Sequence, residues 1–441
     1  MKQVEVEVNP ELVEGKQNPS QNPSLRKAIR LKHAVALYAS SVLGSGVLVL
    51  PGLTAKIAGP ASILAWALLS VASYPFAYTF ASLSARRPES GGIYAFAKEG
   101  FGFRAGALIG WLFAFWVISG APAVTLIAAS YIGYAFPLSR AETYLIAFGI
   151  VVVAFAINYR GIVVSSRVQF AVIGSIVALL IATIASSVFF VKAQNFQPFL
   201  PAGPLAVGTA AALIFWSYLG YENTSNVAEE FENPERDFHR SIILSVALIS
   251  FLYLAVAFVT IGTRAYEAGG SVAPFAAILS NILGRHAAEG TALVAVFIIF
   301  GTVNAYTTGV SRLLYAAARD GGLPHFLDHL NQKTRVPDRV LLALLSSYAA
   351  VLIIYYFSKI DLETALLVPS GAAILVYVVG SAAGVKILGE PNDRTRRNLL
   401  LPLASLAISL VVLPFIGPLL VFSLVVVLLA VAYISFTKRS D

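Results

Sequence analysis

Two long apolar stretches of the chain are interrupted near their middle by short runs that contain glycine and serine. Gly44, Ser45 and Gly46 lie almost at the midpoint of the apolar stretch 31–58, and residues 215–220 lie near the midpoint of the stretch 204–230. In lipid, a backbone N–H or C=O group without a partner costs several kcal/mol, so a membrane helix is broken only where other groups satisfy it. The two runs therefore predict two broken helices whose freed backbone groups can bind a ligand.

Glycines in a membrane helix also have a purely structural use, because they allow two helices to pack closely. The positions of the two runs favour binding over packing. Each run lies on the first helix of a predicted five-helix unit, one unit in each half of the chain. Glycine-interrupted helices at corresponding positions of two halves are the best sequence indication of a transporter's binding site.

The first break has a defined chemistry. It frees the N–H groups of Ser45, Gly46 and Val47 at the start of a half-helix, where the helix dipole is positive and anions bind. Glycine suits this place because the backbone can approach a ligand without a Cβ in the way. The carbonyl groups of residues 41–43 just before the break can accept hydrogen bonds from an ammonium group. N–H groups that can donate to a carboxylate, next to C=O groups that can accept from an ammonium, suit a zwitterion such as an α-amino acid.

Aromatic residues surround the second run. Phe215, Trp216 and Tyr218 adjoin the predicted break, and Trp116 lies in the apolar stretch 104–136. This lining favours a ligand with a neutral, hydrophobic side chain, although aromatic residues of membrane helices more often serve packing or interface anchoring. The predicted ligand site comprises the following residues: Val42, Leu43, Gly44, Ser45, Gly46, Val47, Phe215, Trp216, Ser217, Tyr218 and Gly220.

Glu222 is the one carboxylate that we place near the middle of the membrane. An ionisable group at that depth is a candidate for function by default, so Glu222 is our candidate for proton coupling. A structural role stays open, because this carboxyl group could instead cap the broken helix or bond to Asn304 or Thr302. The hydroxyl groups of Thr302, Thr307 and Thr308 are available to a sodium ion, but threonine in a helix more often bonds to its own backbone.

The composition requires a membrane around these elements. Of the residues, 58% are hydrophobic and 12% are charged, whereas about a quarter of the residues of a soluble domain are charged. Apolar stretches long enough to cross a bilayer, about 20 residues each, recur along the chain. The twelve predicted transmembrane helices span 31–58, 60–85, 104–136, 142–158, 167–191, 204–230, 240–262, 286–317, 340–357, 363–388, 399–414 and 416–436.

The positions of lysine and arginine predict the orientation in the membrane. With the N-terminus in the cytoplasm, only six of the 31 Lys and Arg residues fall outside: Lys56, Arg140, Lys192, Arg264, Arg285 and Lys359. This positive-inside bias places both termini in the cytoplasm. It also accounts for the net charge of +8 without a nucleic-acid partner.

The same topology divides the chain. Residues 1–25 are polar and lack the apolar core of a signal peptide, so we predict a disordered cytoplasmic tail. Residues 26–195 form a first unit of five helices and residues 196–390 a second one. Because five is odd, the second unit starts from the opposite side of the membrane and is an inverted repeat of the first. Residues 391–441 add two helices and a short C-terminal tail.

The motifs together resemble those of the amino acid–polyamine–organocation (APC) transporters. The resemblance is carried by residues 44–47, 88–94, 215–222 and 229–240, and it covers the chain from about residue 25 to the end. Within this superfamily, the chain is similar to bacterial exporters of methionine and branched-chain amino acids.

The resemblance implies a LeuT-type fold of two inverted five-helix repeats that works by alternating access. It also implies that the carboxylate of an amino acid binds at residues 45–47, that Trp216 closes over the substrate and that Glu222 takes part in proton sensing. We assign Trp116 to the same gate. Several proton-coupled relatives carry a lysine seven residues after a glutamine that matches Gln169, and this chain has Ile176 there. The coupling ion, a proton or sodium, stays open.

We therefore expect a secondary transporter of L-amino acids in the cell membrane, an exporter or exchanger for substrates such as leucine, isoleucine, valine, methionine or alanine. It would act as a monomer or homodimer and be neither an enzyme nor a metal- or cofactor-binding protein, since no catalytic motif or ligand cluster is present. Two alternatives stay open. A polyamine or organic-cation transporter of the same fold would need more carboxylates at mid-depth, and a non-transporting amino acid sensor would need a domain that passes on a signal.

Overall fold

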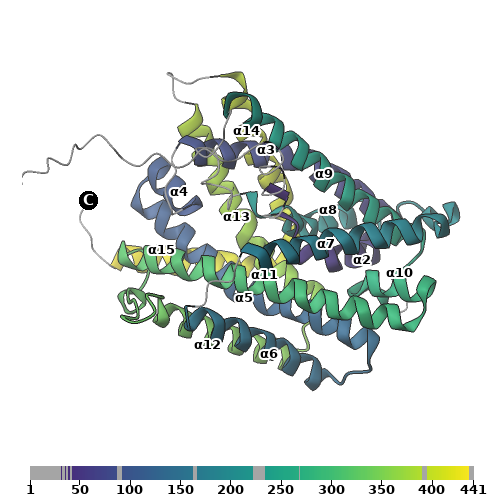
Figure 1. Ribbon diagram of the computed structural model, residues 1–441. Coiled ribbons are helices and arrows are strands. Elements are labelled where there is room, and N and C mark those ends of the chain that lie inside the picture. Colours follow the sequence, from purple (N-terminus) through teal and green to yellow (C-terminus); the bar gives the residue numbers. More distant parts are fainter. Residues whose placement is uncertain are drawn as a thin grey trace, which may run out of the picture.

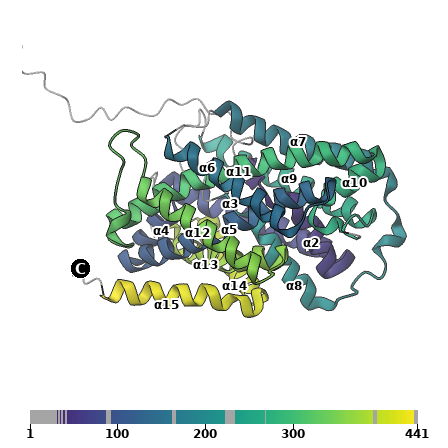
Figure 2. The same ribbon diagram turned by 90° about the horizontal axis from the view of Figure 1, so that it is seen from below.

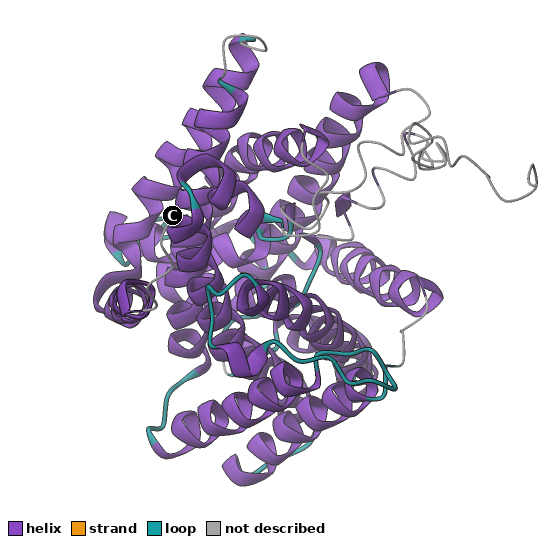
Figure 3. Cartoon of the chain, turned by 90° about the vertical axis from the view of Figure 1, so that its left-hand side faces the viewer, coloured by secondary structure: helices purple, strands orange, loops and turns teal. Residues whose placement is uncertain are grey.

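The computed structural model of the protein describes residues 31, 35, 38, 39, 42–86, 92–161, 166–221, 234–267, 269–389 and 395–436, with the backbone alone for 166, 167, 169 and 234–238. Every regular element in these ranges is a helix, and no β-strand occurs among them (Figure 1). Figure 3 shows these helices joined by loops. The predicted all-α architecture is confirmed.

Nine segments of the described chain are long and apolar enough to cross a membrane. Two of them contain two helices each: α2 (Gly46–Ala58) with α3 (Ser62–Arg86), and α14 (Arg396–Val412) with α15 (Leu420–Phe436). The other seven contain α5 (Phe103–Ala135), α6 (Arg140–Tyr159), α7 (Ser166–Ser187), α9 (Pro234–Gly262), α11 (Arg285–Arg319), α12 (Asp338–Phe357) and α13 (Leu362–Leu388). The protein is a polytopic membrane protein, while twelve spans and an inverted repeat stay predictions.

Three shorter helices complete the described part. They are α4 (Ile93–Phe101), α8 (Gly203–Ile214) and α10 (Pro274–Leu283). The sequence predicted one span over 204–230, but the α-helix there ends at Ile214. The sequence did not predict α4 and α10. Proline is the first residue of α10. It has no N–H group, and this is tolerated because the first N–H groups of a helix have no partner within the helix.

Local sequence signals explain where several long helices begin. The Ser139 side chain accepts a hydrogen bond from the N–H of Glu142, whose carboxylate accepts from the N–H of Ser139, and this capping box starts α6. Asp361 starts α13 by accepting from the N–H of Thr364 at 2.8 Å. These caps satisfy N–H groups that a helix cannot pair within itself.

The centre of the bundle contains α5, α13 and the segment of α2 and α3. In each of these, 78% of the most apolar stretch is buried within the protein, against 17% for the segment of α14 and α15. Helix α5 packs against α11, α13 and α6. Helix α15 lies along the edge of the molecule (Figure 2), where its exposed apolar side chains suit contact with lipid.

A polar clamp attaches the short helix α4 to the end of α11. Lys98 Nζ lies 2.7 Å from Asp320 Oδ2, and the Tyr94 hydroxyl donates to the same oxygen at 3.1 Å. Burial alone would raise the pKa of Asp320, but the hydrogen bonds from Lys98 and Tyr94 outweigh it and lower that pKa. The carboxylate is therefore charged at neutral pH and holds the two helices together.

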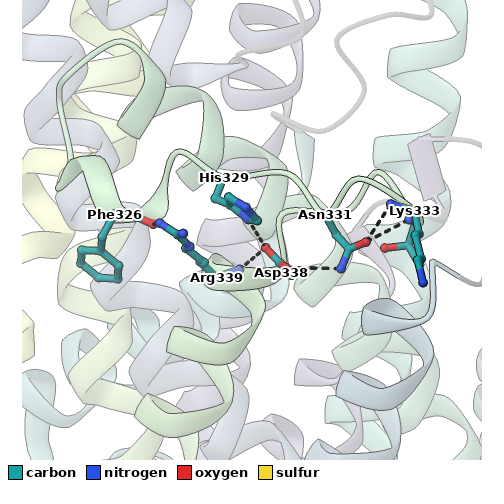
Figure 4. A network of polar contacts seen from close by, with 7 residues as sticks. Phe326, His329, Asn331, Lys333, Asp338 and Arg339 are labelled. Carbon is teal, nitrogen blue, oxygen red and sulfur yellow. Dashed lines mark hydrogen bonds and ion pairs between the residues drawn. The ribbon is translucent and has the colours of Figure 1, made fainter.

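A second polar network orders the connection between α11 and α12 (Figure 4). Asp338 is its centre: its Oδ1 lies 2.7 Å from His329 Nδ1 and accepts the N–H of Arg339 at 2.8 Å. Asn331 donates to Asp338 Oδ2 at 3.4 Å and accepts the N–H of Lys333 at 3.0 Å. These hydrogen bonds hold the start of α12 against the loop that follows α11.

Candidate functional site

The first apolar stretch is interrupted at residues 43–45. Val42 is helical, and Leu43 makes a helical hydrogen bond to Ala39 at 2.8 Å. Helix α2 then starts afresh at Gly46, with no side-chain cap from Ser45. No hydrogen bond joins the N–H of Gly46 or Val47 to another described residue. Among the described residues, these two buried N–H groups at the start of α2 therefore have no backbone partner.

The second interruption follows α8. The chain tightens into a 3₁₀ turn, η5 (Phe215–Tyr218), and Leu219 is extended. Gly220 has φ +125°, a conformation that a residue with a Cβ rarely adopts, and its N–H donates to the Tyr377 hydroxyl at 3.3 Å. Tyr221 is the last described residue before a gap, so Glu222 lies outside the described residues.

The two interruptions touch each other. A Cβ placed on Gly46 would lie 2.6 Å from Ser217 Oγ and 3.0 Å from Trp216 Cδ1. Only glycine permits this approach, because carbon atoms in contact normally stay about 3.5 Å or more apart. The tertiary structure thus brings together two motifs that are far apart in the sequence.

The hydroxyl group of Ser217 lies where the two interruptions touch, at Gly46 and residues 216–217, which we call the junction. Its oxygen is buried and has no hydrogen-bond partner within the described part of the chain. Buried polar groups are nearly always paired, so an unpaired one calls for an explanation such as a bound ligand or water. Val42, Leu43, Ser45 and Val47 are also buried, each 3% exposed or less, while Gly44 is partly exposed.

Trp216 forms one wall of the junction. Its ring lies against α5, where a Cβ on Gly120 would come within 2.6 Å of Cη2. The Trp116 ring stands nearly perpendicular to it at 6.3 Å, and Tyr306 of α11 lies 6.4 Å from Trp116. The structure therefore brings the two predicted gate residues, Trp216 and Trp116, together.

Phe215 and Tyr218 point to other neighbours. Phe215 packs edge-on against Phe76 and Tyr377 at 5.4 and 5.3 Å. The Tyr218 hydroxyl lies 2.6 Å from Ser70 Oγ. Both side chains contact α3, which places them in the packing behind the turn rather than beside the Trp116 ring.

Tyr253 of α9 joins the two interruptions. Its hydroxyl lies 3.2 Å from the carbonyl oxygen of Val42 and 3.0 Å from that of Ser217. Sequence reasoning missed this residue, as it missed Gly120 and Tyr306. Tyr253 is one tyrosine in a long apolar helix, and nothing local distinguishes it from a packing residue.

Comparison with known proteins agrees with this architecture. Residues 29–439 match the family described as amino acid permease. The chain belongs to the amino acid permease family. The predicted family is thus confirmed, and the protein is a permease rather than an enzyme.

Several curated relatives cover most of this permease. The uncharacterized amino acid permease YecA of Bacillus subtilis is 37% identical over 83% of this chain and 87% of its own length. The L-methionine/branched-chain amino acid exporter YjeH of Escherichia coli is 29% identical over 82% and 87%. The methylthioribose transporter of Bacillus subtilis is also 29% identical, over 73% of each chain. Family membership therefore leaves the exact cargo of this permease open.

The junction gives this permease both backbone N–H donors and backbone C=O acceptors. The N–H groups of Gly46 and Val47 lie at the start of α2, and the carbonyl groups of Val42 and Ser217 converge on the Tyr253 hydroxyl. The surrounding helices α2, α5 and α8 and the turn η5 contain no aspartate or glutamate. The described site is polar through its backbone and through the hydroxyl groups of Ser217 and Tyr253, and its wall at Trp216 is aromatic.

Proposed function

We propose that this permease is a secondary transporter of neutral, hydrophobic L-amino acids, and that the substrate binds where the two interrupted helices meet. One observation carries the proposal: the buried Ser217 hydroxyl lies against Gly46, at the start of α2, and neither this hydroxyl nor the N–H groups of Gly46 and Val47 have a partner among the described residues. An amino acid would supply the missing partners. Leaving these groups unpaired in a sealed interior costs about 1–3 kcal/mol each, so the arrangement favours a polar ligand.

The polarity of the junction matches a zwitterion. The carboxylate would accept from the N–H groups of Ser45, Gly46 and Val47, where the helix dipole adds attraction. The ammonium group would donate to the carbonyl groups on the other side, those of Val42 and Ser217. Gly46 would let the ligand and η5 approach the backbone without a side chain between them.

The apolar wall would select the side chain of the substrate. Trp216, Trp116 and Tyr306 offer aromatic surface, and Trp216 would close over a bound amino acid. The helices α2, α5 and α8 beside the junction contain no carboxylate for a second positive charge, which argues against a polyamine or another organic cation. Export of methionine and branched-chain amino acids by the relative in Escherichia coli agrees with leucine, isoleucine, valine and methionine as candidates. The apolar wall adds alanine to the candidates.

The remaining parts of the proposal concern topology and coupling. The permease would lie in the cell membrane with both termini in the cytoplasm, as twelve helices with a 5+5 inverted repeat in residues 26–390. It would work by alternating access as an exporter or exchanger. Glu222, which lies outside the described residues, is our candidate for proton coupling, and sodium is the other coupling ion to test. Ile176, at 1% exposed, is buried where some relatives carry a lysine.

A two-step experiment tests the function. The purified permease is first screened by thermal shift against the twenty amino acids, spermidine and methylthioribose, and we expect the five neutral amino acids named above to stabilise it. Proteoliposomes loaded with unlabelled leucine should then take up labelled leucine by exchange. Absence of binding and of transport for leucine, methionine and alanine under every ion gradient would refute the substrate class. Stabilisation by methylthioribose or spermidine alone would show that the permease binds that compound instead of a neutral amino acid.

A further inference from the structure

Three basic residues gather where the end of α6 meets the loop between α11 and α12. Arg160 follows α6 directly, and Lys333 and Arg335 lie in the loop; all three are exposed. A Cβ on Gly161 would lie 3.3 Å from the carbonyl oxygen of Thr334, and these two residues are the chain neighbours of the three cations. Arg160, Lys333 and Arg335, which we call the basic rim, therefore surround one backbone contact.

Hydrogen bonds within the loop fix the backbone of its two basic residues. The side-chain oxygen of Asn331 accepts the N–H of Lys333 at 3.0 Å (Figure 4) and that of Thr334 at 3.2 Å, as in an Asx turn. The N–H of Arg335 donates to the backbone carbonyl of Asn331 at 2.9 Å. The Asn331 side chain is itself held by Asp338 at the start of α12. The loop therefore presents these charges from a defined position.

No carboxylate in the described part of the chain neutralises the basic rim. None of its three residues forms an ion pair with a described residue. Asp338 is bound by His329 instead, and Asp328, the other aspartate nearby in the chain, makes no ion pair with the rim. Residues 162–166, which follow α6, contain no acidic residue. The positive-inside bias accounts for the sign of these charges, but it does not require three of them to share one place without a partner.

The basic rim lies at the end of two helices that face lipid. Helix α6 exposes Val153 and helix α12 exposes Leu342, apolar side chains that suit contact with acyl chains. Tyr159 directly precedes Arg160 and is partly exposed, and tyrosine is typical of the boundary between membrane and water. The rim therefore lies at the level of the lipid headgroups.

We propose that the basic rim binds the phosphate group of an anionic phospholipid. An arginine can bond to two phosphate oxygens at once, and a lysine adds a compact positive charge. In the topology proposed above, the rim faces the cytoplasmic leaflet, whose negative surface attracts basic residues next to membrane helices. A lipid suits the rim better than free phosphate, because the apolar faces of α6 and α12 continue into it and can contact the acyl chains.

A fluorophore beside the rim can report which lipid binds. The sequence contains no cysteine, so Gln332→Cys, at an exposed position next to Lys333, carries a single label. The labelled permease is placed in phosphatidylcholine vesicles with a small fraction of nitroxide-labelled phosphatidylglycerol or nitroxide-labelled phosphatidylcholine. Each basic residue beside an anionic surface contributes a factor of about five in binding. We therefore expect half-maximal quenching at a mole fraction of phosphatidylglycerol at least about tenfold lower than that of phosphatidylcholine.

Three substitutions link that preference to the rim. Arg160→Gln, Lys333→Gln and Arg335→Gln together should remove it, and Lys333→Gln alone should reduce it about fivefold. The single variant decides if the triple one does not fold. Higher ionic strength should weaken the preference, because salt screens exposed charges. Equal quenching by the two lipids, or the same preference in a folded variant, would overturn the proposal.

A label on the opposite side of the membrane is the matched control. Ala141→Cys is exposed at the other end of α6, where Arg140 is accompanied by Glu142, and its preference should be less than about twofold. Relief of quenching at Gln332→Cys by inorganic phosphate would identify a free anion as the ligand and refute the choice of a lipid. Lipid binding needs no amino acid substrate, so this result is independent of the proposed transport function.

Discussion

Replacing Gly46 by alanine directly tests whether the two interrupted helices must touch. The added Cβ would lie 2.6 Å from Ser217 Oγ, 3.0 Å from Trp216 Cδ1 and 3.3 Å from Ser217 Cα. Normal carbon contacts begin near about 3.5 Å, so α2 and η5 must separate by roughly 0.5 Å even if the hydroxyl rotates away. Overpacking of this kind costs about 1–3 kcal/mol. We expect the leucine Kd to rise about tenfold or more, because each 1.4 kcal/mol corresponds to a factor of about ten.

The assay is calorimetry of leucine binding to the detergent-solubilised permease, after size-exclusion chromatography has shown that the variant is folded. Gly149→Ala in α6 is the matched control, because Gly149 is exposed and a Cβ there meets nothing within 4 Å. Its Kd should equal that of the unmodified protein. A second control, Gly46→Ala combined with Ser217→Ala, removes the closest contact. A folded Gly46→Ala variant with an unchanged leucine Kd would refute the idea that the substrate binds at this junction.

Three other predictions concern the gate, the clamp and coupling. Gly120→Val should slow leucine exchange at least about tenfold by displacing the Trp216 ring; exchange at the native rate would show that the ring position does not matter. Asp320→Asn should lower stability by up to about 1 kcal/mol equally at pH 6 and pH 8. Because the pKa of Asp320 is lowered from 3.8, the stability from its bond to Lys98 is present above that value and lost as the pH falls through the lowered pKa. Thermal melts across pH measure it, and a deficit that changes between pH 6 and pH 8 would assign the effect to another group. Glu222→Gln should flatten the pH dependence of transport in proteoliposomes, whereas an unchanged pH profile would leave Glu222 a structural residue.

Much of the fold follows from local sequence signals. Apolar stretches of sufficient length predict the long helices, and the boundaries of α5, α6 and α12 differ from the predicted ones by at most two residues. The signal is strong because every peptide group in lipid must be paired within its own helix. The short helices α4 and α10 were missed because neither is long enough to stand out as a span.

The positions of both interruptions were also predictable from the residues themselves. Gly46 starts a new helix, and Gly220 adopts a backbone conformation that other residues avoid. These are properties of single residues and of the few around them. The sequence alone therefore determined that this chain is a membrane protein with an interruption before Gly46 and a departure from the α-helix after Ile214, and its motifs correctly indicated its family.

Only the tertiary structure decided which side chains meet at the junction. Four consecutive aromatic and polar residues follow α8, and a 3₁₀ turn separates neighbouring side chains by about 120°. Trp216 consequently faces Gly46, while Phe215 and Tyr218 face α3. Tyr253 reaches the backbone of both interruptions from a helix that follows them in the chain. Such contacts depend on how whole helices pack and rotate against one another, and no local pattern in the sequence records that.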